Sequence, residues 1–590
     1  MDEGDGDEGD GDEVDGGERV PKADTTEPAA DGAVSARRGD GLPPTPDLLV
    51  LGGAVLLCIA FAPVFVVAPY SPRVVILVGF LPLGVAALVS LCRRRDRAAL
   101  AAATFVVVAT ISALLSANPR ISLVGQMGKE ASAVLLLAFI GWWAIGRQLG
   151  QRGRELLPYA LLIGLGLNAV VAVLQVALHN TSSSFGVADG GRAPGLTANP
   201  VQLGALMAAG VAISGTFALS RSDRWIAWMV AVAGFSAAAN LSGTRVAIVS
   251  IAVLLVAWLI IHRSWRVVAA GGAAVAGVLV SDVFRRTATT TSRLTDGFDR
   301  QGAWLYGLRS FLSRPLLGFG PGGFRGAVQH RYSADFVRTA ALDDRRSAWF
   351  DAHNVAIEYL VATGIIGLCL LCVFVWFSAR RARGPLMAAF VAIAITWSLQ
   401  PMSVSTAPIA LLALGAAAPA AIIAADDRVR HRRPVIAAAG VIGLVLAVSY
   451  AAIDLRLQAA VDSGSATRIE SAAGWFPRDA AVADIVASGW ANAYLFEHAD
   501  KQHLLFWAHQ VVEREPDRPY WWAKYASTQM SFGDDVGGRA SLETALTLEP
   551  WSPTAWPLML ELANRTNDAE LHTLALGKVC ELQLKACTEP

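Results

Sequence analysis

Five arginines and one histidine of this 590-residue chain lie where long apolar segments meet polar ones. They are, in order along the chain, Arg120, Arg192, Arg245, Arg300, Arg309 and His353. A guanidinium stays protonated and offers a planar fork of N–H donors to two phosphate oxygens at once. An imidazole can accept the proton of a hydroxyl group near neutral pH. These residue types therefore suit a reaction in which negative charge grows on phosphate while a hydroxyl loses its proton.

Each of these residues belongs to a short polar motif. The motifs are SANPRISLVGQMGKE with Arg120, GGRAPGLTANPVQLGALMA with Arg192 and Asn199, NLSGTRVAIVSI with Arg245, RPLLGFGPGGF with Gly320, and His353-Asn354 followed by Glu358. Taken singly, each has an ordinary reading. An arginine at the end of a membrane span usually reaches lipid phosphates, and Asn-Pro is a common helix start. A shared position on one side of the membrane is what favours a joint site.

The elements that must position these motifs are membrane spans. Hydrophobic residues make up 54% of the chain, the mean hydropathy is +0.45, and the apolar residues form long separate runs. We predict thirteen spans, at 48–69, 73–92, 98–117, 131–146, 156–178, 200–220, 225–241, 244–261, 266–283, 354–379, 385–400, 405–425 and 435–454. The predicted fold class is all-α, a polytopic membrane bundle of about 12–13 transmembrane helices with a large extracytoplasmic loop and a C-terminal α-helical repeat domain.

Arginine placement predicts the topology. Eighteen arginines lie in six connecting segments, at 93–97, 147–154, 221–224, 262–266, 380–383 and 428–433. The short loops between these segments hold only five basic residues. Because basic residues that flank spans stay in the cytoplasm, the N-terminus is expected inside and, with an odd number of spans, the C-terminal region outside. Every motif named above then opens on the outer face of a cell membrane.

Three further regions complete the predicted organisation. Residues 1–46 hold 14 acidic and four basic residues and are expected to form a disordered acidic cytoplasmic tail before the transmembrane domain at 47–455. The segment 284–352 is long enough to be a functional loop, and it holds 11 arginines against six acidic residues. Its excess of positive charge would attract an anionic substrate.

The region 456–590 contains a repeat. Glu515-Pro516, Pro519 and Trp522 recur 34 residues later as Glu549-Pro550, Pro553 and Trp556. A period of 34 is that of tetratricopeptide helix pairs, so we predict an extracytoplasmic TPR-like helical domain, with an irregular helical domain as the alternative. Such arrays form concave surfaces, which raises the possibility of a protein partner.

Two cysteines near the C-terminus are candidates for oxidation, Cys580 and Cys587. Within one continuous helix they would lie about 10 Å apart, beyond the reach of a disulfide. A bridge between them therefore requires the helix to end first.

The ordered series of motifs, over about residues 100 to 425, resembles the O-antigen ligase and polymerase family. Members of this family are membrane glycosyltransferases that use glycans linked to a polyprenol through pyrophosphate. The resemblance implies an inverting, metal-independent transfer from that donor to an acceptor hydroxyl. No Asp-x-Asp pair occurs among the motifs, so neither a metal nor another cofactor is expected, and no nucleic-acid partner is expected.

The resemblance also implies roles for residues. His353 stands where the family has its catalytic histidine, and we assign Arg245 and Arg300 to catalysis with it. Substrate binding is assigned to Arg120, Arg192, Asn199, Arg309, Gly320, Asn354 and Glu358. Asn354 or Asp351 would also orient or tune the imidazole. Three positions depart from the family pattern. Ala362 replaces an acidic residue, so either Glu358, one turn earlier, substitutes for it or the carboxylate is dispensable. Val201 replaces a second asparagine, and Thr244 replaces the serine before Arg245.

The nature of the acceptor stays open at this stage. A ligase would transfer the glycan to a lipid, protein or wall polymer, and a polymerase of the same family would transfer it to a second lipid-linked repeat unit. A transporter of lipid-linked glycans is a third interpretation. Two observations argue against it: the ionisable residues collect at one surface, and the spans show no duplication. A membrane-anchored scaffold would leave the arginines unexplained.

Overall fold

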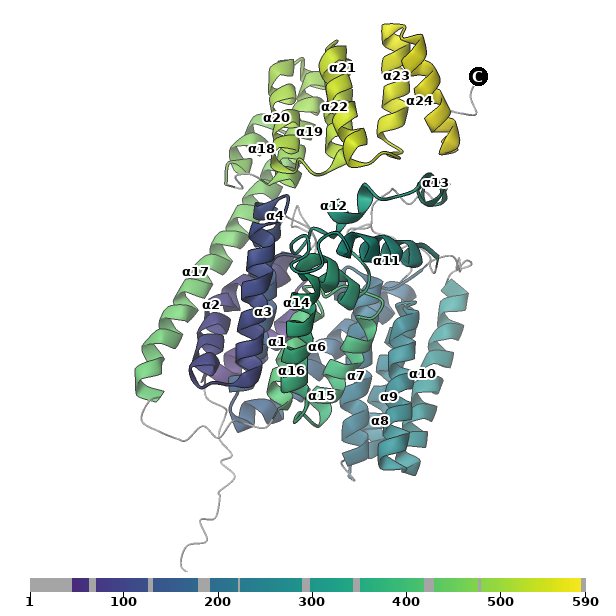
Figure 1. The fold of residues 1–590 in the computed structure, drawn as a ribbon. Helices are drawn as coiled ribbons and strands as arrows, with labels where there is room; N and C mark the ends of the chain where they lie inside the picture. Colours follow the sequence, from purple (N-terminus) through teal and green to yellow (C-terminus); the bar gives the residue numbers. More distant parts are fainter. Residues whose placement is uncertain are drawn as a thin grey trace, which may run out of the picture. The chain divides into compact units, whose positions relative to one another are not determined.

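The computed structural model describes residues 45–62, 71–125, 131–178, 191–220, 223–288, 298–342, 351–418, 429–475 and 479–584. These residues form helices joined by turns and contain no strand, which confirms the all-α prediction (Figure 1). The predicted acidic tail, residues 1–46, lies outside the described residues except for its last two.

Thirteen apolar helices correspond to the thirteen predicted spans. They are α1 (Thr45–Ile59), α2 (Ser71–Arg93), α3 (Arg97–Leu114), α5 (Ala133–Gln148), α6 (Gln151–Ala177), α7 (Pro200–Ser220), α8 (Trp225–Leu241), α9 (Arg245–His262), α10 (Trp265–Ala288), α14 (Val355–Ala379), α15 (Pro385–Thr396), α16 (Ala407–Ala417) and α17 (Val429–Asp462). Within the described residues, eight of them are long and apolar enough to cross a membrane. The chain is a multi-pass membrane protein.

Helices α1, α15 and α16 are shorter than the predicted spans 48–69, 385–400 and 405–425, of which residues 63–69 and 419–425 lie outside the described residues. Between α15 and α16, residues 397–406 leave the helical conformation and are hydrogen-bonded to one another, with Ser403 Oγ 3.1 Å from Thr406 Oγ1. Non-helical backbone is tolerated at membrane depth where protein rather than lipid surrounds it, and ten of the eleven residues of α16 are buried.

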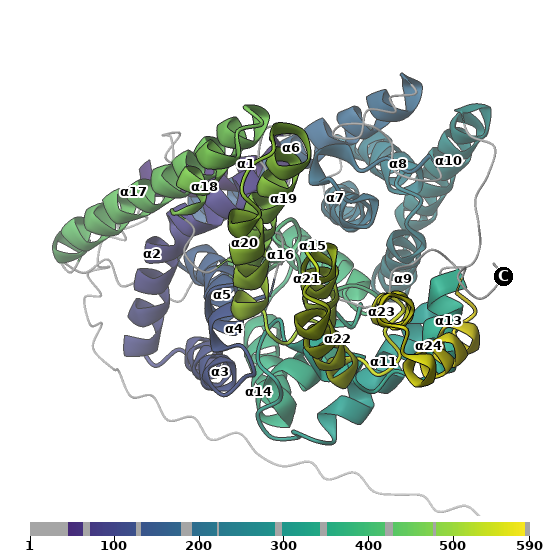
Figure 2. The same ribbon diagram turned by 90° about the horizontal axis from the view of Figure 1, so that it is seen from above.

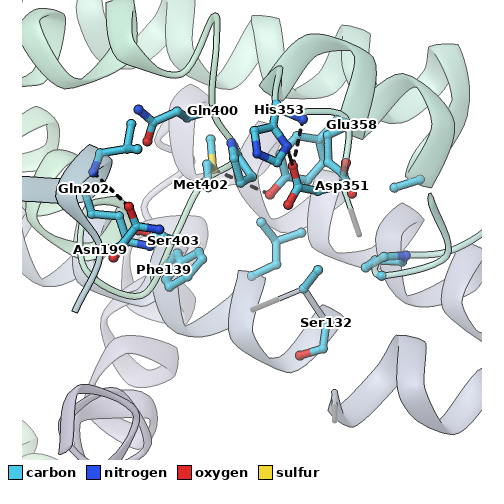
Figure 3. Close-up of a pocket in the computed structure, with 18 residues that line it drawn as sticks. Ser132, Phe139, Asn199, Gln202, Asp351, His353, Glu358, Gln400, Met402 and Ser403 are labelled. Carbon is cyan, nitrogen blue, oxygen red and sulfur yellow. Dashed lines mark hydrogen bonds and ion pairs between the residues drawn. The ribbon is translucent and has the colours of Figure 1, made fainter. Parts of the chain in front are cut away.

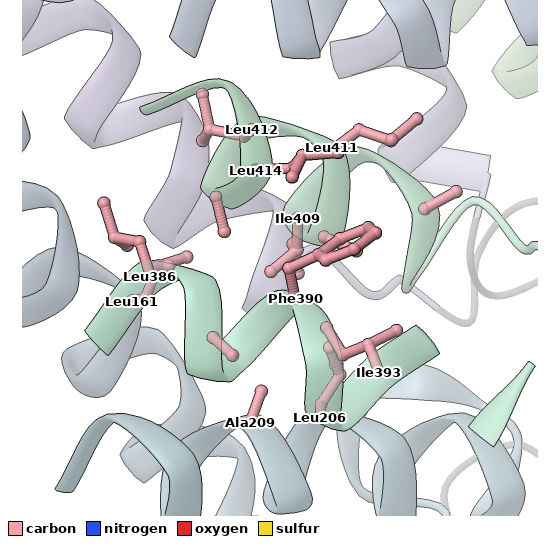
Figure 4. Packing of buried hydrophobic residues seen from close by; sticks show 14 of the residues in the cluster. Leu161, Leu206, Ala209, Leu386, Phe390, Ile393, Ile409, Leu411, Leu412 and Leu414 are labelled. Atoms are coloured by element: carbon pink, nitrogen blue, oxygen red, sulfur yellow. The ribbon is translucent and has the colours of Figure 1, made fainter. Parts of the chain in front are cut away.

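The core of the bundle forms where α5, α7, α15 and α16 cross (Figures 2 and 4). Leu206, Phe390 and Leu412 interlock there, each at most 5% exposed. Glycines allow the closest crossing: a Cβ on Gly415 of α16 would lie 2.1 Å from the backbone oxygen of Trp143 in α5. Small residues at helix crossings are typical of membrane proteins, where close packing replaces the hydrophobic effect between helices.

Beyond α17 the described residues, 463–475 and 479–584, form seven further helices. They are α18 (Ala466–Ala473), α19 (Ala480–Glu497), α20 (Lys501–Arg514), α21 (Pro519–Ser531), α22 (Asp535–Leu548), α23 (Ala555–Thr566) and α24 (Ala569–Glu581). Consecutive helices pack as the pairs α19 with α20, α21 with α22, and α23 with α24.

The sequence repeat in this region corresponds to a structural repeat. The indole N–H of Trp522 donates to the carbonyl of Pro516 at 2.8 Å, and that of Trp556 donates to the carbonyl of Pro550 at 2.9 Å. The backbone repeats as well, because the N–H of Glu515 and of Glu549, 34 residues apart, each donates to a carbonyl four residues earlier. The assignment of these helices to the tetratricopeptide class stays a prediction.

The last helix of this region, α24, carries Cys580 near its end. Cys580 is disulfide-bonded, and α24 ends one residue later, at Glu581. The chain therefore leaves the helix at the point where a bridge requires it to. Cys587 lies outside the described residues.

Candidate active site

The turn before α14 holds His353 in an unusual conformation. Its φ is +47°, a region that few residues other than glycine adopt and that tends to occur at functional sites. Asp351 Oδ1 accepts the backbone N–H of His353 at 2.7 Å, and Glu358 Oε2 accepts that of Ala352 at 2.8 Å. Asn354 closes the turn as the N-cap of α14 by accepting the N–H of Ile357. Two carboxylates thus hold the backbone that carries the imidazole.

The imidazole itself faces one of these carboxylates. Nδ1 of His353 lies 2.6 Å from Oδ1 of Asp351, and the two side chains are 31% and 24% exposed. An acidic partner at Nδ1 favours the tautomer with its proton there and leaves the Nε2 lone pair for a reacting group. From the other side, the indole N–H of Trp304 in α11 donates to the carbonyl of Ala352 at 2.8 Å. Trp304 therefore supports the histidine turn.

His353 lines a pocket between α7 and α14 (Figure 3). The cavity has a volume of about 370 Å³. It brings together three residues predicted for the site, His353, Glu358 and Asn199, which come from helices far apart in sequence. Other lining residues include Ser132 and Phe139 of α5, Gln202, Pro321, Gly322, Asp351, Tyr359, Gln400, Pro401, Met402 and Ser403.

A second group of predicted residues meets at the starts of α7 and α9. The backbone N–H of Ala193 donates to the carbonyl of Leu241 at 3.0 Å, and Nε of Arg192 donates to the carbonyl of Ser242 at 3.1 Å. Thr244 Oγ1 donates to the carbonyl of Pro200, next to Asn199, at 3.0 Å. These bonds draw Arg192, Asn199 and Arg245 to one corner of the bundle.

Arg245 is the exposed arginine of this corner. It is the first residue of α9, its side chain is exposed, and it makes no side-chain hydrogen bond with any residue that the structure describes. A guanidinium in this position can reach a phosphate without first breaking an ion pair within those residues.

The remaining predicted residues take other positions. Arg309 lies on the exposed side of α11 (Phe298–Phe311), with its guanidinium 5.6 Å from the ring centre of Tyr306. Arg300 lies in the same helix, and its side chain is outside the described set. Arg120 belongs to α4 (Pro119–Val124). None of these three is among the described residues that line the pocket.

Gly320 and Asn354 both form hydrogen bonds with other residues of the protein. The N–H of Gly320, a residue predicted to bind substrate, donates to the carbonyl of Ala362 at 2.8 Å. The amide of Asn354 donates to the carbonyl of Ser398 at 2.8 Å, in addition to its capping role. Their predicted contacts with substrate stay predictions, and the structure assigns both residues to packing around the pocket.

The glycine-rich loop packs into a break in α14. Gly364 has φ +66° and ψ −171°, which interrupts the helix at this point. The carbonyls of Val361 and Ala362 then accept N–H groups from Phe319 and Gly320, and the N–H of Ile365 donates to the carbonyl of Pro315 at 2.8 Å. The loop that contributes Pro321 and Gly322 to the pocket is therefore fixed to the helix that carries Glu358.

The C-terminal helices pack against this same loop region. Aromatic and aliphatic residues of α11, α12 (Phe324–Gln329) and α13 (Ala334–Leu342) share one hydrophobic cluster with α21 to α24. Gln329 Nε2 donates to the carbonyl of Asp517 at 2.6 Å, and Asn118 Nδ2 donates to the carbonyl of Arg514 at 3.1 Å. One face of the predicted docking domain is thus occupied by the chain itself.

Charged residues are buried at this contact. Burial and the nearby Arg518 lower the pKa of the Arg325 guanidinium to about 10, while Glu515 and Glu549 act in the opposite direction. Burial also raises the pKa of Glu549 to about 7, against the effects of Arg325 and of a hydrogen bond with Ser552. Glu515 and Glu549 are equivalent positions of successive repeats. Arg325 of the loop therefore interacts with two repeats at once.

Sequence reasoning missed several residues of the site region. Gln202, Gln400 and Ser403 line the pocket. The hint for Gln400 and Ser403 was the polar run SLQPMSVS between two apolar segments, and Gln202 belongs to the motif that contains Asn199. Arg73 is fully buried at the start of α2, where it donates to the carbonyls of Leu57, Cys58 and Leu196. A charge inside a predicted span was a usable signal for it. It ties α1 to the segment between Arg192 and Asn199.

Among the described residues, no group of three or more histidine, cysteine, aspartate or glutamate side chains is placed to hold a metal ion.

The histidine turn and the exposed arginine at the start of α9 lie within one segment of the chain, which also supplies part of the pocket lining. Residues 230–372 match the O-antigen ligase family. The O-antigen ligase segment covers about a quarter of the chain and runs from α8 into the second half of α14. It contains Arg245, Arg300, Arg309, His353 and Glu358. The resemblance inferred from the motifs is therefore confirmed for this segment.

The O-antigen ligase match indicates a membrane glycosyltransferase of the ligase or polymerase type. Arg120, Arg192 and Asn199 precede the matched residues, and tertiary contacts connect Arg192 and the residue after Asn199 with the O-antigen ligase segment. No curated protein matches this chain.

Proposed function

We propose that this protein transfers a glycan from a polyprenyl-pyrophosphate-linked donor to an acceptor hydroxyl, at the outer face of the membrane. The observation that supports this most is the His353–Asp351 pair, which belongs to the O-antigen ligase segment and opens into a pocket. An imidazole held by a carboxylate next to a cavity is an arrangement suited to removing a proton from a bound hydroxyl.

In the proposed reaction, the acceptor oxygen attacks the anomeric carbon of the donor glycan and its proton passes to Nε2 of His353. The bond between the anomeric carbon and the phosphate oxygen breaks with inversion, and polyprenyl pyrophosphate leaves with the electron pair. Asp351, at Nδ1, stabilises the imidazolium that forms. The balance needs no redox partner, because one C–O bond forms and one breaks.

Negative charge grows on the pyrophosphate during this step. Arg245 is exposed and without a side-chain partner in the described part of the chain, and Arg192 is held beside it at the same corner. Guanidinium groups stabilise such charge through paired hydrogen bonds. Arg300 and Arg309 of α11 are proposed to act with them as the glycan donor enters from the membrane.

The acceptor decides between the two activities of this class. As a ligase, the protein would modify a lipid, a protein or a wall polymer, and as a polymerase it would extend a second lipid-linked repeat unit. Ligation is our proposal, and the polymerase activity is its alternative. A reaction with lipid-linked glycan as the sole substrate separates them, because only a polymerase forms longer lipid-linked chains from it.

The proposal is tested with full-length protein in nanodiscs and radiolabelled lipid-linked glycan extracted from the producing cell. His353→Ala should lose transfer by at least a thousandfold while donor binding is retained. His330→Ala is the matched control, since His330 is an exposed histidine of the same loop region. Transfer should also persist in excess chelator. Full activity of His353→Ala, or a strict need for added magnesium, would refute the proposed mechanism.

A further inference from the structure

Two glutamine side chains line the pocket, and in each of them one polar atom has no hydrogen-bond partner among the described residues. Nε2 of Gln400 and Oε1 of Gln202 are both buried and make no hydrogen bond with any residue of the described chain. Gln400 is only 7% exposed. The two residues come from the α15–α16 connection and from the first turn of α7, so the pocket alone brings them together (Figure 3).

A buried polar atom without a hydrogen bond is costly, by about 1–3 kcal/mol per group. Native proteins rarely leave such groups unpaired, and those that remain often belong to binding sites. One of the two atoms is a donor and the other an acceptor. A hydroxyl group can satisfy both kinds, because it donates one hydrogen bond and accepts others.

The rest of the lining indicates the class of ligand. The described lining residues include no arginine or lysine, and the further polar groups are those of Asn199, Ser132, Ser403 and the two carboxylates beside His353. Phe139 and Tyr359 supply aromatic surface. Such a lining suits a neutral ring with several hydroxyl groups, since apolar walls provide contact area and a few polar groups set its orientation. The lining does not suit a diphosphate, because Arg245, the arginine proposed to bind phosphate, is not among the lining residues.

We propose that Gln202 and Gln400 form a sugar subsite beside His353, in which their amides bind hydroxyl groups of one sugar ring. This inference rests on the proposed function and divides the site into two parts: the pocket holds a sugar, and the arginine corner holds the pyrophosphate. The sugar belongs either to the donor glycan, at its anomeric end, or to the acceptor, at the hydroxyl that reacts. Both place a hydroxylated ring next to the imidazole.

The variants Gln400→Leu and Gln202→Leu keep side-chain size and remove the amide. Removing an unpaired buried amide should not lower stability, so the melting temperature of both variants is expected to equal or exceed that of the wild type. Gln151→Leu is the matched control, because Gln151 is an exposed glutamine at the start of α6 that pairs with Glu155.

Binding is measured first, because it does not depend on transfer. The probes are undecaprenyl pyrophosphate without a sugar and lipid-linked glycan extracted from the producing cell. If the subsite holds the donor sugar, each variant should bind the glycan-bearing probe about tenfold more weakly and the sugar-free probe as the wild type does.

Kinetics then separates the two sources of the sugar. A rise of about tenfold in KM for the donor with kcat changed less than threefold indicates the donor sugar, and the same rise in KM for the acceptor indicates the acceptor sugar. Unchanged binding and unchanged KM for both substrates in Gln400→Leu and Gln202→Leu would overturn the inference. If the wild-type protein binds both probes but transfers nothing, the proposed function is overturned. Weaker binding of the glycan-bearing probe by the variants would still support the subsite in that case.

Discussion

Nδ1 of His353 lies 2.6 Å from Oδ1 of Asp351, and the same carboxylate oxygen accepts the backbone N–H of His353 at 2.7 Å. One aspartate therefore sets both the backbone conformation of the histidine and the orientation of its ring. His353 makes this double contact while its backbone has a positive φ of 47°.

Asp351→Asn is expected to lower the rate of transfer about 10- to 1000-fold, with donor binding retained. An amide can still contact the ring, but it no longer stabilises the imidazolium and it can favour the tautomer with the proton on Nε2. The measurement is the initial rate with labelled donor, beside Asp335→Asn, which alters an exposed carboxylate of α13 paired with Arg338. A wild-type rate in Asp351→Asn would show that the carboxylate only shapes the turn.

Arg245→Lys is expected to lower the rate at least tenfold, because lysine keeps the charge but loses the planar fork that binds two oxygens. Arg245 has no side-chain partner among the described residues, so the melting temperature should stay unchanged. Arg263→Lys, at the opposite end of α9, is the control. If Arg245→Lys transfers as fast as the wild type, the residue serves only to contact lipid headgroups.

Arg325→Met is expected to loosen the packing of the C-terminal helices on the loop. The change leaves Glu549 buried without its nearby cation, whereas Glu515 keeps its ion pair with Arg518. Removing the cation beside a buried carboxylate costs up to about 3–5 kcal/mol. Hydrogen exchange should rise in α12 and in α21 to α23, and transfer should fall with it. Arg338→Met, which alters an exposed ion pair of α13, should change neither. Unchanged exchange in Arg325→Met would mean that the hydrophobic cluster alone holds the contact.

Glu549 predicts a dependence of stability on pH. Its pKa is raised from 4.5 to about 7 in the folded protein, so the folded chain holds a proton that the unfolded chain releases. The stabilisation from this group is complete below pH 4.5 and is lost as the pH rises to about 7, by an amount on the order of 3 kcal/mol.

Thermal unfolding at a series of pH values between 4.5 and 8 checks this prediction. Glu549→Gln should flatten the curve over that range, because the amide does not titrate. Glu543→Gln, at an exposed residue paired with Arg539, should leave the curve as in the wild type. Parallel curves for the wild type and Glu549→Gln would contradict the assignment.

Several features followed from the sequence because they depend on local patterns. The thirteen apolar helices arise from runs of hydrophobic residues, whose preference for lipid does not depend on distant parts of the chain. The helical repeat arises from a period of 34 that also spaces the Trp522 and Trp556 hydrogen bonds. Arg245 and His353 were identifiable from residue types in their motifs, and the O-antigen ligase match covers both.

Only the tertiary structure decided which of these residues meet. Gln202 and Gln400 face one pocket although almost two hundred positions separate them, and Arg325 reaches both Glu515 and Glu549 because the repeats pack on the loop. The shortening of α15 and α16 also depends on their burial by neighbouring helices. Periodicity and residue type specify the face that an element buries, whereas contacts between distant elements depend on how those faces pack together in space.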